Sequence, residues 1–266
     1  MMGTRVSRAV GVTALLILYG CSNLPNRIIY FQGDQDCASL NEESLLTSAD
    51  DLGPTSTTAT LQCALTIIRS SRTASLLKTS LPSRVALHLA ERQPPSADRE
   101  ALASEGVKLA EQALRLGGKG DAGVHYYLAA NLGLAISDHP VQAAENIQRL
   151  ASELTQALAL SPDVDLGGPL RLLGMLYLKA PPWPTGVGDG DKALHYLNEA
   201  VSKYPSHPLN HLFYAEALYE VDEKKAEAQK EIDAGQRLLT EGPWGYNKEV
   251  WQKEFADMVQ EIRGGH

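Results

Sequence analysis

Residues 191–205 read DKALHYLNEAVSKYP, and this stretch decides the fold. Ala193, Leu197 and Ala200 follow one another at intervals of four and three residues, so they lie on one face of a helix. A proline then ends that helix. The same spacing, again closed by a proline, recurs in residues 150–162, LASELTQALALSP. The recurrence indicates a repeated helical unit.

The spacing resembles the second helix of a tetratricopeptide repeat, in which small residues at fixed offsets let two helices pack closely. Gly174 and Tyr177 match the first helix of the same unit. A more divergent unit follows, with Ala215 and Leu218 in its first helix and residues 228–235 in its second. The resemblance implies an all-α fold, an α-solenoid of tetratricopeptide-like antiparallel helix hairpins. A non-repeating helical bundle is the alternative.

Composition also favours helices. Of the 266 residues 44% are apolar, and only three Phe and three Trp occur among many Leu and Ala. We expect residues 21–58 to form a polar tether with a short helix near 41–49, and residues 59–266 to form the helical domain. Helices are expected from residue 60, from 82, from 96 to the glycines at 117 and 118, and over 124–136, 141–160, 169–179, 191–203, 208–220, 224–239 and 249–262.

The first twenty residues are typical of a targeting signal. Arg5 and Arg8 precede the uncharged run AVGVTALLILY, which is too short to span a bilayer core of about 30 Å. The following LYGCS resembles the bacterial lipobox, which implies a signal peptide over 1–20 and lipidation of Cys21. By the same resemblance, Ser22 implies an outer-membrane lipoprotein that faces the periplasm of a Gram-negative bacterium. A plain secretory signal is the alternative.

Charge and cysteine content restrict the partners and the compartment. Removal of residues 1–20 leaves 22 basic and 32 acidic residues, a net charge of -10, which argues against a nucleic-acid partner. In an oxidising compartment we expect a disulfide between Cys37 and Cys63, worth roughly 3 kcal/mol in the chain-entropy model. The alternative is a reactive thiol, for which no basic neighbour is evident in the sequence.

A longer block carries a second resemblance. Residues 168–184, GPLRLLGMLYLKAPPWP, together with PLNHLFYAEAL at 208–218 and HYYLAANLG at 125–133, resemble the T component of tripartite ATP-independent periplasmic (TRAP) transporters. The resemblance implies a lipid-anchored helical protein with a ligand-accommodating cleft, a periplasmic solute-binding protein as partner, and homo-oligomers in some members. We expect a non-enzymatic accessory that binds or hands over a small apolar or organic-acid solute. The alternative is a scaffold lipoprotein that binds other envelope proteins through its concave face.

The loop over residues 180–190 is longer than a tetratricopeptide repeat requires. Its sequence, APPWPTGVGDG, is rich in proline and glycine and cannot form a helix. Trp183 in this loop is a candidate for lining a ligand cleft or an oligomer interface. Alternatively, it fills the gap between the two helices that the loop connects. Asp189 precedes the next helix and is expected to cap its N-terminus.

The remaining candidates lie on the first helices of the hairpins. Tyr177, Asn210, His211 and Tyr214 are candidates for ligand or partner binding, because these helices line the concave face of a solenoid. Hydrogen bonds between helices are the alternative role. His207 and His211 share a helical face, but the Glu beside the first His and the third ligand of a zinc peptidase are missing, so we expect no metal site. We also expect no cofactor and no catalytic residue.

The C-terminal helix concentrates large apolar residues. Residues Val250, Trp251, Phe255, Met258 and Ile262 follow helical spacing. We expect them to form the buried face of a capping helix. An exposed docking patch is the alternative.

Overall fold

The computed structural model describes residue 37 and residues 40–49 and 52–264. The signal peptide and Cys21 lie outside the described residues, so both remain predictions. Within the described residues the chain is all-α, and the only β-type pairing is an isolated bridge between Pro182 and Gly188. The helices are α1 (Glu42–Thr47), α2 (Thr58–Ser70), α3 (Ala74–Leu77), α4 (Leu81–Glu91), α5 (Ala97–Arg115), α6 (Ala122–Ile136), α7 (Pro140–Leu160), α8 (Gly168–Lys179), α9 (Gly190–Lys203), α10 (Pro208–Glu220), α11 (Lys225–Glu241) and α12 (Asn247–Gly264), with a 3₁₀ turn, η3 (Gly118–Gly120), after α5.

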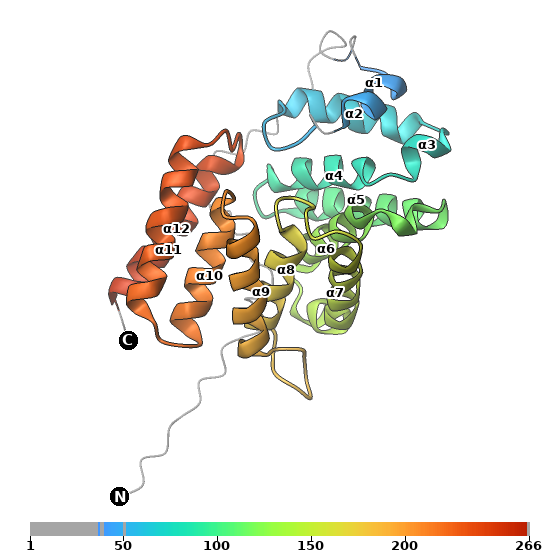
Figure 1. The fold of residues 1–266 in the computed structure, drawn as a ribbon. Helices are drawn as coiled ribbons and strands as arrows, with labels where there is room; N and C mark the ends of the chain where they lie inside the picture. The colour runs from blue at the N-terminus through green and yellow to red at the C-terminus, as the bar shows by residue number, and fades with distance from the viewer. Residues whose placement is uncertain (1–36, 38–39, 50–51, 265–266) are drawn as a thin grey trace, which may run out of the picture.

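Successive helices pack against each other in pairs. The most extensive contacts all join helices that are consecutive in the chain: α4 to α5, α5 to α6, α6 to α7, α8 to α9 and α10 to α11 (Figure 1). Connections of three to ten residues join α4 to α5, α6 to α7, α8 to α9 and α10 to α11, so each of these pairs forms an antiparallel hairpin. This neighbour-to-neighbour packing is consistent with a solenoid-like array.

The spacing that predicted the hairpins marks close helix contacts. Ala193, Leu197 and Ala200 on α9 are fully buried. Gly174 on α8 lies so close to Leu197 that a Cβ atom at this position would overlap the leucine side chain. A small residue is therefore required where α8 crosses α9. The predicted cap is also confirmed, since the Asp189 carboxylate accepts a hydrogen bond of 3.0 Å from the backbone N–H of Lys192.

Two hairpins share the same polar contact. His125 Nδ1 on α6 lies 2.7 Å from Glu153 Oε2 on α7, and His211 Nδ1 on α10 lies 2.7 Å from Glu231 Oε2 on α11. In both cases Nε2 pairs with the backbone carbonyl of the residue six positions earlier, at 3.1 and 2.8 Å respectively. The repeated geometry supports structural equivalence of these two hairpins.

The two ends of the array meet. The backbone N–H of Tyr246, in the loop before α12, donates to the carbonyl of Pro54 at 3.3 Å, and the Tyr246 hydroxyl donates to the carbonyl of Arg92 at 3.0 Å. Arg92 also donates to the carbonyls of Pro54 and Ser56, at 3.1 and 2.7 Å. These contacts hold the segment before α2 against the loop before α12.

The packed body begins earlier than residue 59. Leu45 on α1 is fully buried and Leu52 is nearly so, both in a core cluster with α2, α3 and α4. The C-terminal part of the expected tether therefore belongs to the body. The short helix α3 was also not predicted, because a single turn has no periodicity to detect.

Cys37 and Cys63 form the expected disulfide, with their Cα atoms 5.3 Å apart. Four of the five residues expected on the buried face of the C-terminal helix, Trp251, Phe255, Met258 and Ile262 of α12, are buried, and Val250 is half-buried. In the part of the chain that the structure describes, no helix combines the length and apolar character needed to cross a membrane.

Candidate functional site

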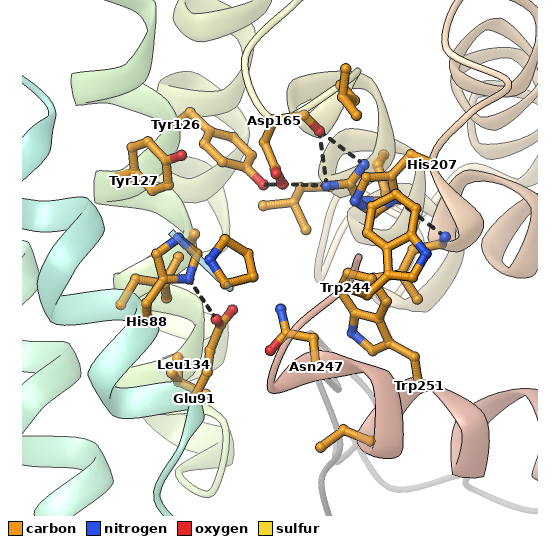
Figure 2. A pocket seen from close by; sticks show the side chains of 18 of the residues that line it. His88, Glu91, Tyr126, Tyr127, Leu134, Asp165, His207, Trp244, Asn247 and Trp251 are labelled. Atoms are coloured by element: carbon orange, nitrogen blue, oxygen red, sulfur yellow. Dashed lines mark hydrogen bonds and ion pairs between the residues drawn. The ribbon is translucent and has the colours of Figure 1, made fainter. Parts of the chain in front are cut away.

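A cavity of about 270 Å³ lies between the first helices of the hairpins and α12. Helices α4, α6, α8, α10 and α12 contribute side chains to its wall, and Pro54, Thr55, Pro243 and Trp244 add the two segments that join the ends of the array (Figure 2). Its apolar wall residues include Leu87, Ala130, Leu134, Leu172, Leu209, Val250 and Trp251. The size is near the lower end of typical ligand pockets, roughly 300–1,000 Å³.

One end of the cavity holds a fixed polar group. The Asp165 carboxylate accepts a hydrogen bond of 2.6 Å from the Tyr126 hydroxyl and forms an ion pair with Arg171. Asp165 and Leu166 both have left-handed backbone conformations, with φ of 51° and 50°, and this turn directs Asp165 toward α6 and α8. Burial alone would raise the pKa of Asp165, but the Arg171 guanidinium holds that pKa below its usual value.

Arg171 is itself fixed by Asn210. The guanidinium donates to Asn210 Oδ1 at 2.8 Å, and Asn210 Nδ2 donates to the carbonyls of Leu166 and Tyr204 at 3.0 and 2.9 Å. Asn210 is fully buried and uses its amide to hold the turn before α8 against α10. This contact matches the alternative role, a hydrogen bond between helices.

His207 forms the adjacent wall as a neutral ring. Burial, reinforced by the Arg171 charge, lowers the pKa of His207 to about 3. Its Nδ1 accepts a hydrogen bond of 3.3 Å from the backbone N–H of Leu209, so the proton of the neutral ring is on Nε2. The ring centroid lies 5.3 Å from that of Trp244 and 5.4 Å from that of Trp251.

Two more carboxylates line the cavity, Glu91 on α4 and Glu254 on α12. His88 Nδ1 on α4 lies 3.1 Å from Glu91 Oε2, and Asn247 lies across the cavity from Glu91 (Figure 2). Glu254 on α12 also lines the cavity, and its Oε2 is buried with no hydrogen-bond partner among the described residues. Burial, together with neighbouring carboxylates such as Glu216, raises the pKa of Glu254 well above its ordinary value.

The residues selected from the sequence lie elsewhere. Of the described wall residues, none is Tyr177, Trp183, Asn210, His211 or Tyr214. Tyr177 stacks on Tyr196, with ring centroids 5.7 Å apart. Trp183 is 84% exposed, so it does not fill the gap between α8 and α9, and it does not line this cavity. Its role in an oligomer interface stays a prediction.

The two histidines on α10 have separate roles. His211 is held by Glu231 and the Pro205 carbonyl, whereas His207 caps the helix and borders the cavity. Tyr214 is half-buried. Among the residues that the structure describes, no cluster of three His, Cys, Asp or Glu side chains has the arrangement of a metal site.

Sequence reasoning did not select the polar residues of the cavity. Tyr126 and Arg171 lie on α6 and α8, where every residue of α6 and most of α8 are buried. A polar side chain on a helix that is buried on all sides needs a polar partner inside the protein. That conflict between residue type and burial is a signal that could have identified both positions.

The chain was also compared with known proteins. No family model matches it, and no curated protein matches it either. The fold and the cavity therefore carry the functional argument.

Proposed function

We propose that this chain is a non-enzymatic binding protein of the bacterial envelope that holds a small organic molecule in its central cavity. The observation that carries the proposal is the cavity itself, with an apolar and aromatic wall and a few fixed polar groups. Such a combination is typical of small-molecule sites, where apolar walls supply affinity and polar groups fix orientation. The polar groups at the Asp165 end bond to one another, which suits holding a ligand better than activating one.

The resemblance to the TRAP T component gives this binding role a context. In this proposal Cys21 is lipidated and anchors the tetratricopeptide-like body to the outer membrane. The body receives a small solute or hands it to a periplasmic solute-binding protein. Homo-oligomer formation belongs to the same proposal. The tetratricopeptide assignment is supported by the matching spacing in α7 and α9.

A scaffold role is the second candidate, and one observation favours it. Trp183 is 84% exposed on a loop with Pro181, Pro182 and Pro184. An exposed tryptophan on a stiff loop suits a protein-docking contact. In this reading an envelope protein binds the loop and the cavity has only a packing role.

Native mass spectrometry of the full chain, extracted in mild detergent, tests the two candidates. The binding proposal expects a co-purified small molecule that is lost in Ala130→Phe, which fills the cavity wall, and kept in Trp183→Ala. A circular dichroism spectrum equal to that of the wild type shows that Ala130→Phe has folded. Retention of the added mass in a folded Ala130→Phe protein contradicts the proposal. Loss of a co-purified protein in Trp183→Ala alone favours the scaffold.

A further inference from the structure

The charges that line the cavity do not balance. Three carboxylates, those of Glu91, Asp165 and Glu254, face two guanidiniums. Arg171 is taken by Asp165, and Arg99 forms an ion pair of 3.0 Å with a carboxylate outside the cavity wall, that of Asp138. Glu91 is paired with a histidine on the same helix. Glu254 is therefore the carboxylate whose charge has no counterpart in the described wall.

The surroundings of Glu254 add further negative charge. The carboxylates of Glu216, Asp257 and Glu91 all raise the pKa of Glu254, after burial itself. One of these carboxylates, Glu216, already pairs with Lys179 at 2.6 Å, and Lys179 is shared with Glu220. Without a ligand, Glu254 keeps a proton more readily than an ordinary glutamate does.

Aromatic rings lie beside this carboxylate. Trp251 precedes Glu254 by three residues on α12, so the two side chains share one face of the helix, and both line the cavity. The Trp244 ring lies 5.7 Å from the Trp251 ring, and Asn247 lies one turn before Trp251. The face of an indole ring attracts cations, and a nearby carboxylate reinforces that attraction.

We propose that the cavity binds a small organic cation, a protonated amine with an apolar body, whose ammonium group is placed between Glu254 and the two tryptophans. The proposal rests on the binding role proposed above. A carboxylate ligand would instead add negative charge beside Glu254, Glu216 and Glu91, and the Arg171 guanidinium is already engaged by Asp165 and Asn210. The charge pattern thus favours an amine over the apolar or organic-acid solute expected from the sequence.

Binding of an amine should release a proton from Glu254. The ammonium keeps its proton, while a protonated Glu254 releases its own to the solvent as the ion pair forms. Affinity should therefore rise with pH until Glu254 is ionised in the free protein. Neither a neutral nor an acidic ligand should show this release.

Isothermal titration calorimetry of the full chain with three probes of matched shape tests the proposal. The probes are 2-phenylethylamine, 2-phenylethanol and phenylacetate. We expect the amine to bind at least about tenfold more tightly than the alcohol and phenylacetate to bind most weakly. Titrations in buffers of different ionisation enthalpy should show proton release for the amine alone.

Two variants distinguish the effect of the ion pair on binding from the effect of the apolar cavity. Glu254→Gln should weaken the amine about tenfold or more, abolish its proton release and leave 2-phenylethanol unchanged. Glu249→Gln, on an exposed residue of the same helix, should change neither. Tightest binding by phenylacetate, or an unchanged amine affinity in Glu254→Gln, overturns the cation proposal while leaving the cavity a binding site. Failure of all three probes overturns the cation proposal, and the proposed function falls as well only if native mass spectrometry finds no bound molecule.

Discussion

Breaking the ion pair between Arg171 and Asp165 from one side should strongly destabilise the fold. Replacing Arg171 by Met keeps an unbranched apolar stem and removes the guanidinium with its charge and its donors. The Arg171 side chain is 4% exposed, so water cannot take over the hydrogen bonds that its guanidinium donates. Removing one partner of a buried ion pair costs about 3–5 kcal/mol. The Asp165 side chain is 35% exposed and keeps its hydrogen bond from Tyr126. We therefore expect the free energy of unfolding to fall by about 3 kcal/mol, the lower end of that range.

Urea unfolding at pH 7, followed by far-UV circular dichroism, measures this loss. Arg69→Met is the matched control, because Arg69 makes two hydrogen bonds to Glu105, at 2.7 and 2.6 Å, yet its side chain is 55% exposed. That exposed pair should contribute at most about 1 kcal/mol. Adding Asp165→Asn to Arg171→Met should recover part of the loss, because no unpaired carboxylate then remains.

Acid titration adds a second readout. The pKa of Asp165 is held below its unfolded value, so the pair stabilises the fold above the unfolded pKa, and this contribution is lost as pH falls through the folded pKa. Arg171→Met should remove that part of the acid dependence. Equal losses in Arg171→Met and Arg69→Met, or no recovery in the double variant, would refute the reasoning about burial.

Three further predictions concern single features. His207 has a pKa of about 3 in the folded protein and about 6.5 in the unfolded chain. Between these values only the unfolded chain protonates His207, so the free energy of unfolding should fall by about 2 kcal/mol between pH 7 and pH 5. Asparagine also caps helices, so His207→Asn should flatten the change between pH 7 and 5 in urea unfolding; an unchanged slope would contradict the assignment. Gly174→Ala should lower stability by about 1–3 kcal/mol through overlap with Leu197, whereas a neutral effect would show that α8 and α9 can separate without cost. Reduction of the Cys37–Cys63 disulfide should lower the unfolding free energy by roughly 3 kcal/mol, and dithiothreitol should have no effect on Cys63→Ala.

Local sequence was sufficient for the helices. The expected ranges 208–220 and 191–203 differ from α10 and α9 by at most one residue, because their limits depend on nearby groups such as the Asp189 cap and the proline at 205. The spacing of Ala193, Leu197 and Ala200 likewise identified the buried face of α9. Periodicity and capping act over a few residues, so they can be recognised without the fold.

The cavity depended on contacts that no local pattern contains. Periodicity indicates that the face of α12 with Trp251 is buried, but not that Glu254 on the same helix lines the same cavity as Glu91 of α4. His207 and His211 look equivalent in the sequence, and only the tertiary structure places one beside the cavity and the other on Glu231.

The sequence by itself determined the helical segments other than α3, most of their limits, and that neighbouring helices pack against each other. Only the tertiary structure decided that Tyr246 meets Pro54 and Arg92, so that the two ends of the array come together around a cavity. The physical reason is distance along the chain: helix periodicity is set by neighbours three and four residues apart, whereas Tyr246 and Arg92 are separated by 154 residues.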